Sequence, residues 1–430
     1  MSSAKIESFL NLLKESRLVG DRWLESARLG ASGEKDAGAV ARRLVHTGHL
    51  TRWQARVLLA GKSGPFFMGN YRLLKPLGEG GMGTVYKAVQ AKIGRIVALK
   101  VMALKNERSL TRFEREIRAM AALDHPHIVH AFDADRVDDV YFLVMEYVRG
   151  RDLKKWIDAA APLPIGWSCE CIRQAALGLQ YAHERGIVHR DIKPSNLLLV
   201  QKSLQEPPHV KIADFGLARA GFDGIEAGGL TRVGQAVGTS EYIAPEQASD
   251  STAVDIRSDI FSLGCTLFEL LTGQFPFRGA SPFERLMARF QQDAPPASSL
   301  RGEVPPDLDR VVARMLERDP DRRFQTPSDV VEALVPFTSP ELTVFREPGG
   351  APVNRTPDPS TADLAGSDAA LDQFLESLSG ELNSHSFSTL SKPRRRLRAA
   401  GLSLAIAALA MLLLLVVVSW TLGSGWWITQ

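Results

Sequence analysis

Helix-like hydrophobic patches separated by glycines occupy the beginning of the chain, residues 1–62. Residues 1–14 have the pattern of a short polar helix. Residues 50–60 predict a second helix, whose Trp53, Val57 and Leu58 fall on one face. We therefore expect a small helical N-terminal segment that acts as a cap or as a docking surface.

A denser apolar pattern follows, from residue 71 to residue 337. Strand-like runs come first, at residues 71–77, 84–89 and 96–101, and helix-like runs come later, beginning with residues 110–123. Residues 201–209, which include two prolines, have the pattern of a long hairpin between two further strands. Strands followed by helices predict a two-part α+β body of about 270 residues, large but not unusual for one domain.

The composition changes again over residues 341–391, where proline, serine, aspartate and glycine dominate. Residues 341–390 hold eight acidic and two basic residues. Such a polar, charged segment buries too little apolar surface to fold alone, so we expect a disordered acidic linker. A short helix at residues 371–378 is compatible with the pattern.

Residues 399–422 form a charge-free run of 24 residues. At about 1.5 Å per residue this run is long enough to cross a hydrocarbon core of about 30 Å. The alternative, a buried soluble helix, would need protein to cover every face of the run. The run therefore predicts a single membrane span.

The flanks of the run predict its orientation. Five cations lie within residues 392–398, and the tail at residues 423–430 has no charged residue. The basic flank favours the inner side, which places residues 1–398 in the cytoplasm, and the tryptophans near the far end suit the outer interface. Next to a membrane, the basic run indicates contact with anionic lipid headgroups rather than with nucleic acid.

Composition narrows the classes of function. The chain has 430 residues, 52 lysines and arginines and 49 aspartates and glutamates, so its formal net charge is +3. This balance, with 45% hydrophobic and 23% charged residues, argues against a dedicated polyanion binder and against a wholly disordered chain.

The three cysteines, Cys169, Cys171 and Cys265, are too few for a disulfide framework and fit a reducing compartment. No other metal-ligand cluster accompanies Cys169 and Cys171, so we expect buried apolar side chains there rather than a metal site. The first 30 residues lack the features of a secretory signal, which again predicts a cytoplasmic body.

Candidate chemistry begins with Gly78, Gly80 and Gly83, spaced as GxGxxG. Glycines at this spacing let the backbone approach phosphate oxygens, but the spacing alone also marks dinucleotide-binding folds. A dinucleotide loop opens a helix, whereas here the strand-like residues 84–89 follow. The glycines are therefore expected in a hairpin.

Lys100 lies within the apolar strand at residues 96–101. A buried ammonium requires a partner. Glu116, in the helix-like stretch 110–123, can supply it and leave Lys100 facing ligand phosphates, and Glu114 is a competing partner. The alternative is a surface lysine on an edge strand.

Three more motifs follow in order: HRDIKPSN at residues 189–196, DFG at 214–216 and APE at 244–246. With the glycine loop and the strand around Lys100, they occur in the order that protein kinases show, so residues 71–337 resemble the protein kinase superfamily. The HRDIKPSN sequence, the segment GTSEYIAPE from Gly238 and a span behind the body are similar to bacterial eukaryotic-like serine/threonine kinases. The resemblance implies a two-lobed fold with a small β-rich N-lobe and a larger helical C-lobe, followed by a C-terminal transmembrane helix.

The resemblance also implies ATP and Mg²⁺ as cofactors and assigns roles to single residues. Asp214 and Asn196 would hold Mg²⁺, and Asp191 would accept the proton of the substrate hydroxyl. Lys193 would reach the γ-phosphate, and Lys100 would face the ligand phosphates. The adenine pocket would be formed by Leu77, Val85, Ala98, Met145, Glu146, Val148 and Leu198.

Regulatory positions follow from the segment between Asp214 and Gly238. Thr231 is the only hydroxyl residue in residues 215–237, and Arg190 and Arg219 are placed to receive a phosphate there. Thr239 is expected near the substrate hydroxyl. Two structural supports are also expected. Glu246 should pair with Arg323, and Asp259 should bind the catalytic loop.

The predicted function is therefore a serine/threonine protein kinase at the inner membrane, single-pass, with its catalytic domain in the cytoplasm. Expected partners are protein substrates, the membrane and a second copy for trans-autophosphorylation, and no nucleic acid is expected. A nucleotide-binding pseudokinase scaffold is the main alternative, although Lys100, Asp191 and Asp214 are all present. A further alternative is a small-molecule phosphotransferase. The peptide-docking segment at residues 238–246 argues against it.

Overall fold

The computed structural model describes residues 2–31, 36–80, 83–102, 117–118, 120–200, 208–215, 241–249 and 254–338. The predicted linker, basic run, membrane span and tail therefore lie outside the described residues. Within the described residues, no helix combines the length and the hydrophobicity that crossing a membrane requires.

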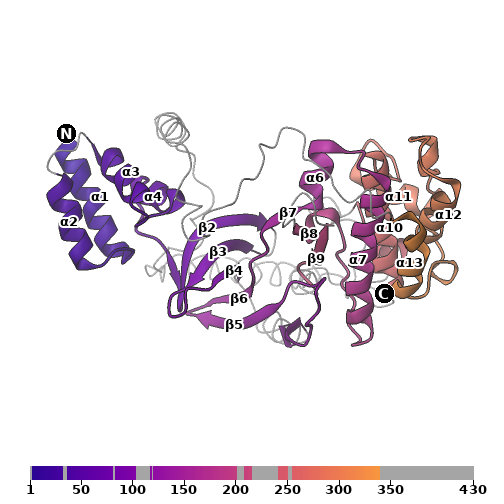
Figure 1. Cartoon of the computed structure of the whole chain (residues 1–430), viewed down its shortest axis with the longest axis horizontal. Helices are drawn as coiled ribbons and strands as arrows, with labels where there is room; N and C mark the ends of the chain where they lie inside the picture. Colours follow the sequence, from indigo (N-terminus) through magenta and orange to yellow (C-terminus); the bar gives the residue numbers. More distant parts are fainter. Residues whose placement is uncertain are drawn as a thin grey trace, which may run out of the picture. The chain divides into compact units, whose positions relative to one another are not determined.

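The elements follow one another as the two-part pattern predicted (Figure 1). The helices are α1 (Ser2–Ser16), α2 (Asp21–Ala31), α3 (Ala37–His46), α4 (Arg52–Leu59), α6 (Leu153–Ala160), α7 (Ile165–His183), α9 (Pro245–Ser249), α10 (Ile256–Thr272), α11 (Pro282–Gln291), α12 (Pro306–Met315) and α13 (Pro327–Leu334). The strands are β1 (Phe67–Met68), β2 (Tyr71–Gly80), β3 (Gly83–Gln90), β4 (Ile96–Met102), β5 (Ala131–Val137), β6 (Val140–Glu146), β7 (Gly150–Asp152), β8 (Leu197–Val200) and β9 (His209–Ile212).

Within its described residues, the N-terminal segment contains four helices. The helices predicted at residues 1–14 and 50–60 correspond to α1 and α4, and the structure adds α2 and α3 between them. Leu13, Val40 and Leu58 are almost fully buried and provide an apolar core for this small unit. Trp53, Val57 and Leu58 are buried as the predicted apolar face of α4 required.

A six-stranded antiparallel sheet follows, in the order β1-β2-β3-β4-β6-β5. The strands predicted at residues 71–77, 84–89 and 96–101 are β2, β3 and β4. Of the helix predicted at residues 110–123, the structure describes residues 117–118 and 120–123, and residues 117–118 and 120–121 are helical.

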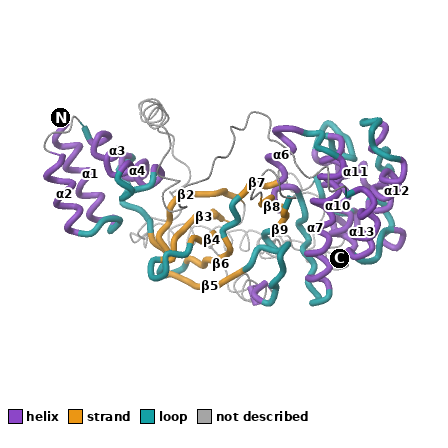
Figure 2. Tube along the Cα trace, in the orientation of Figure 1, coloured by secondary structure: helices purple, strands orange, loops and turns teal. Residues whose placement is uncertain are grey.

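The later part of the body is helical, with α10 packed between α7 and α12 (Figure 1). Helix α10 is buried on nearly all of its faces, which explains its apolar composition. Asp255 caps its first turn, and Gly273 ends it in the left-handed conformation, with φ of 72°. A second sheet, β7-β8-β9, lies beside this helical part (Figure 2).

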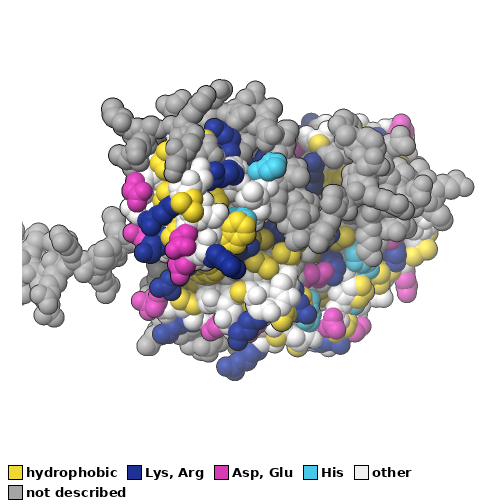
Figure 3. Space-filling model, turned by 60° about the vertical axis from the view of Figure 1, so that its left-hand side comes forward, with side chains coloured by type: hydrophobic (Ala, Val, Ile, Leu, Met, Phe, Trp, Pro, Cys, Tyr) yellow, Lys and Arg dark blue, Asp and Glu magenta, His cyan; other side chains and the backbone are white. Residues whose placement is uncertain are grey.

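One hydrophobic core continues from the large sheet into the helices. Ala98 and Met145 of the sheet belong to the same buried cluster as Leu197 of β8 and Leu267 of α10. On the face that Figure 3 presents, basic and acidic side chains are interspersed over the described surface. This mixture agrees with the near-neutral charge balance of the chain.

Candidate active site

A loop after α7 brings three of the predicted catalytic side chains within hydrogen-bond distance. Lys193 donates from Nζ to both carboxylate oxygens of Asp191, at 3.1 and 2.8 Å. Asn196 donates from Nδ2 to Asp191 Oδ2 at 3.1 Å and to the Asp191 main-chain oxygen at 2.8 Å. A cation and an amide thus hold the Asp191 carboxylate in one orientation.

One buried carboxylate fixes the backbone of this loop. Asp259 on α10 is 1% exposed and accepts hydrogen bonds from the N–H groups of His189 and Arg190, both at 2.7 Å. Burial raises the pKa of Asp259, while His189 and Arg190 act in the opposite direction. Arg190 has φ of 69°, which is rare for a residue with a side chain, and the Asp259 contacts hold this turn. The expected contact between Asp259 and the catalytic loop is confirmed.

A second contact holds the same loop from α9. Gln247 donates from Nε2 to the main-chain oxygen of Arg190 at 2.7 Å. Arg190 Nη2 in turn lies 3.5 Å from the main-chain oxygen of Val254. The role of Gln247 had no signature in the sequence, because its partner is a backbone carbonyl.

Lys100 contacts Asp214 directly. Its Nζ donates to Asp214 Oδ1 at 2.9 Å, and Lys100 is only 5% exposed. Strand β4 lies between β3 and β6, so the alternative of a surface lysine on an edge strand is wrong. The two expected partners, Glu114 and Glu116, lie outside the described residues.

Backbone contacts join Asp214 to the loop that holds Asp191. The N–H of Ala213 donates to the main-chain oxygen of Asn196 at 2.8 Å, and His189 Nε2 donates to the main-chain oxygen of Ala213 at 2.9 Å. The His189 ring also packs edge-on against Phe215, with centroids 4.6 Å apart. Asp214 itself has φ of 62°. The two acidic residues therefore belong to one hydrogen-bonded assembly.

The predicted apolar pocket residues lie around the same core. Ala98 pairs with Met145 across β4 and β6, and both are buried. Val85, Val148 and Leu198 are partly buried against the same cluster. Leu77 is 40% exposed, at the end of β2 nearest the glycines.

Glu146, at the end of β6, forms an ion pair that the sequence did not indicate. Lys211 on β9 donates from Nζ to Glu146 Oε2 at 2.8 Å. The N–H of Glu146 donates to the main-chain oxygen of His130 at 2.8 Å. The side chain of Glu146 thus links the large sheet to the small one.

The glycine motif lies in the hairpin that the sequence predicted. Gly78 pairs with Val85, and Gly80 pairs with Gly83, so both sides of the turn are strands. Gly83 has φ of 136°, and a Cβ atom there would lie 1.9 Å from the main-chain oxygen of Val101. Only glycine fits at that position. A loop that opens a helix is excluded by this geometry.

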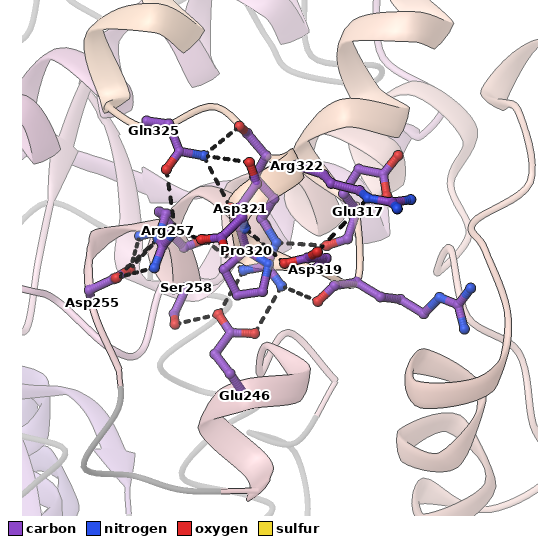
Figure 4. Close-up of polar contacts among 12 residues, drawn as sticks. Glu246, Asp255, Arg257, Ser258, Glu317, Asp319, Pro320, Asp321, Arg322 and Gln325 are labelled. Atoms are coloured by element: carbon purple, nitrogen blue, oxygen red, sulfur yellow. Dashed lines mark hydrogen bonds and ion pairs between the residues drawn. The ribbon is translucent and has the colours of Figure 1, made fainter.

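The predicted pair of Glu246 and Arg323 is bidentate. Arg323 donates from Nη1 and Nη2 to the two carboxylate oxygens, at 2.6 and 2.8 Å, and Ser258 donates to Oε1 at 2.6 Å. Burial alone would raise the pKa of Glu246, but its bonds to Arg323 and Ser258 lower it below the usual value. Figure 4 shows Ser258 facing Glu246, with Arg257 between Asp255 and Gln325.

The donor set near Asp191 fits a hard cation. Asp214 Oδ1 accepts the hydrogen bond from Lys100, and Asn196 Nδ2 donates to Asp191. Among the described residues, Asp214 Oδ2 and Asn196 Oδ1 therefore remain as oxygen atoms that could bind a cation. Carboxylate and amide oxygens are the ligands that Mg²⁺ prefers.

Several predicted residues lie outside the described part of the chain: Gly216, Arg219, Thr231, Gly238 and Thr239. The three cysteines are inside it and are buried, as was expected for Cys169 and Cys171. Burial raises the pKa of Cys169 and of Cys265 to about 12, and raises that of Cys171 well above its usual value. These thiols are therefore poor nucleophiles.

Comparison with known proteins gives a family match over most of the body. The protein kinase domain family matches residues 71–334. The chain is 35% identical over 265 residues to the serine/threonine-protein kinase PrkC of Bacillus subtilis, covering 61% of this chain and 39% of that protein. It is 37% identical over 272 residues to the serine/threonine-protein kinase PknB of Mycolicibacterium smegmatis, covering 62% of this chain and 42% of that protein.

A probable serine/threonine-protein kinase of Clostridium perfringens is 35% identical over 271 residues, which cover 62% of this chain and 38% of the relative. The chain thus spans about two fifths of the length of these curated relatives. The α1–α4 segment precedes the residues that match the family.

Proposed function

The chain belongs to the protein kinase family, and on that premise we propose that it transfers the γ-phosphoryl group of ATP to serine and threonine hydroxyls of proteins. The observation that carries this proposal is the joined assembly of Asp191, Lys193, Asn196, Asp214 and Lys100. Phosphoryl transfer depends mainly on positioning and on charge stabilisation, and this assembly offers both.

In this proposal Asp191 orients the substrate hydroxyl and accepts its proton at a carboxylate oxygen. Asn196 and Lys193 hold that carboxylate in place, and Lys193, 2.8 Å from Oδ2, supplies positive charge near the transferred group. Lys100 supplies a second positive charge at the phosphates. Mg²⁺, held by Asp214 and Asn196, would neutralise the phosphate charge when bound.

The pocket residues orient the nucleotide. Val85, Ala98 and Leu198 offer an apolar slot of the kind that takes an adenine ring, and Met145 closes its back. The β2–β3 hairpin with Gly78 and Gly83 lets its backbone approach the phosphates. Protein substrates are supported by the resemblance of residues 238–246 to a peptide-docking segment.

Regulation and location belong to the same proposal. Thr231 would be the activating phosphorylation site, and its phosphate would pair with Arg190 and Arg219. One copy of the chain would phosphorylate Thr231 of another copy. Residues 399–422 would anchor the chain in the inner membrane with the kinase domain in the cytoplasm.

The test is incubation of the purified full chain with Mg-ATP, with phosphopeptides mapped by mass spectrometry beside an Asp191→Asn variant. The proposal expects phosphate on Thr231 and on an added protein substrate for the wild type, and none for the variant. Nucleotide binding by both proteins without phosphate on either would instead favour the pseudokinase scaffold.

A further inference from the structure

Strand β2 contains two bulges on its way to the glycine hairpin. Leu73 pairs with Ala88 and Lys75 pairs with Lys87, so Leu74 is an extra residue without a partner on β3. The register shifts again between Pro76 and Gly78, where Leu77 is the extra residue. Bulges bend and twist a strand and redirect its side chains. These two bulges therefore decide how β2 passes over the proposed nucleotide pocket.

The first bulge is contacted by helix α4 of the N-terminal segment. Thr51 caps this helix by accepting a hydrogen bond from the Gln54 N–H at 3.2 Å, and Gln54 Oε1 accepts one from the Thr51 N–H at 2.9 Å. This reciprocal pair is a capping box. The Thr51 hydroxyl and the Gln54 Nε2 amide remain as hydrogen-bond donors.

Both remaining donors are directed at consecutive carbonyls of β2. Thr51 Oγ1 donates to the main-chain oxygen of Leu74 at 2.7 Å. Gln54 Nε2 donates to the main-chain oxygen of Leu73 at 2.7 Å. Gln54 is only 1% exposed, so this hydrogen bond is buried. The bulged residue and the one before it are thus bound by α4.

An aromatic contact supports the same junction. The Trp53 ring packs edge-on against Phe66, with centroids 5.5 Å apart, and lies 5.8 Å from the Tyr86 ring of β3. All three side chains are buried. The main-chain oxygen of Phe66 accepts from the Leu73 N–H at 2.8 Å. Helix α4 therefore contacts both strands of the hairpin.

We propose that Thr51 and Gln54 are positioning residues that fix the register of β2 and thereby the placement of the glycine hairpin over the nucleotide. A slip of one residue would turn the side chains of β2 to the opposite face. The slip would also take the carbonyls of Leu73 and Leu74 away from the Thr51 and Gln54 donors, which disfavours the slipped register. Both residues precede the part of the chain that matches the kinase family, so the N-terminal segment adds this function. The inference rests on the proposed function, since it assigns a nucleotide to that site.

The experiment uses the full chain and variants that keep the helix cap. Gln54→Glu keeps the acceptor for the Thr51 N–H and loses the donor to Leu73. Thr51→Asp keeps the cap and loses the donor to Leu74, whereas its matched partner Thr51→Asn keeps both. We expect Gln54→Glu and Thr51→Asp each to weaken Mg-ATP binding at least fivefold by calorimetry, because each removes one hydrogen bond and sets a carboxylate oxygen against a β2 carbonyl. The KM for ATP should rise in parallel, kcat should change less than twofold, and Thr51→Asn should resemble the wild type.

A second capping box in the chain gives a control for general destabilisation. Thr326 and Asp329 cap α13 in the same reciprocal way, and α13 packs against α7 and α12. Thr326→Ala should lower the melting temperature without changing the Kd or the KM for Mg-ATP.

Equal binding of Mg-ATP by the wild type, Gln54→Glu and Thr51→Asp would overturn the inference. The inference would also be overturned if Thr326→Ala weakened Mg-ATP binding as much as Gln54→Glu and Thr51→Asp do, at an equal loss of stability. A wild type that phosphorylates nothing, while Gln54→Glu still weakens Mg-ATP binding, would refute the proposed kinase activity and leave the positioning role standing.

Discussion

Lys100 and Asp214 are separated by 114 positions in the chain, yet the lysine Nζ lies 2.9 Å from the aspartate Oδ1. Lys100 lies on a central strand of the six-stranded sheet, whereas Asp214 follows the last strand of the three-stranded sheet. One ion pair therefore connects the strand-rich part of the body to the segment that leads away from β9.

Replacement of Lys100 by methionine should reduce phosphoryl transfer by about 100-fold or more, because a preorganised charge at the phosphates is lost. Methionine keeps the apolar stem, so the fold should persist. The measurement is the initial rate of phosphate transfer to a protein substrate. Lys92→Met, at an exposed turn, is the matched control and should match the wild type. Activity of Lys100→Met within threefold of the wild type would contradict the assigned role.

Replacement of Arg323 by methionine should destabilise the protein by about 3–5 kcal/mol, because Glu246, whose side chain is only 17% exposed, would be left without its cation. Chemical denaturation measures this change. Arg322→Met is the neighbouring control, since the Arg322 side chain is 75% exposed, and it should change stability by less than about 0.5 kcal/mol. If both variants lose equal stability, the buried pair is not the cause.

His127 predicts a dependence of stability on pH. Burial lowers the pKa of His127 to about 4, although its Nδ1 contacts the main-chain oxygen of Val210 at 2.9 Å. The usual pKa is 6.5, so between pH 6.5 and about 4 the unfolded chain binds a proton that the folded chain does not. The free energy of unfolding should therefore fall as the pH falls through this window.

The measurement is urea unfolding at several pH values for the wild type and for His127→Asn. The asparagine amide nitrogen takes the place of Nδ1 and can donate to the Val210 carbonyl, but it does not titrate. The variant should show a weaker loss of stability between pH 6.5 and 4. Parallel curves for the two proteins would show that His127 does not contribute.

Thr231→Ala should lower the activity toward an added protein substrate at least tenfold, because the phosphate that would pair with Arg190 and Arg219 could not form. The substrate phosphorylation rate is measured after preincubation with Mg-ATP. Thr252→Ala, a hydroxyl residue beyond the APE motif, serves as the control. Full activity and undiminished phosphorylation of residues 215–237 in Thr231→Ala would show that the switch lies elsewhere.

Two arginines introduced at the centre of residues 399–422, as Leu413→Arg and Leu415→Arg, should release the chain from membranes. Each arginine costs about 3 kcal/mol at the bilayer centre. The measurement is the fraction of protein that sediments with membranes after alkaline extraction. Leu413→Ile with Leu415→Ile is the matched control and should stay with the membranes. A wild type that remains in the supernatant would refute the anchor.

The sequence already indicated most of the local site. Asp191, Lys193 and Asn196 lie within six consecutive residues, so their proximity follows from covalent connection. The strands around Gly83 and Lys100 could be predicted from apolar periodicity. The hairpin could be predicted because the residues after the glycines have the pattern of a strand and not of a helix. The pair of Glu246 and Arg323 could be anticipated from the family resemblance.

By itself, then, the sequence determined the order of strands and helices, the chemistry of the loop at residues 189–196 and the family that the chain resembles. The tertiary structure decided which distant groups meet: Lys100 with Asp214, Glu146 with Lys211, and α4 with the bulge at Leu74. The physical reason is that sequence patterns record periodicity and local spacing. Contacts across the fold depend on strand register and on backbone carbonyls, which every residue carries and which leave no mark in the sequence.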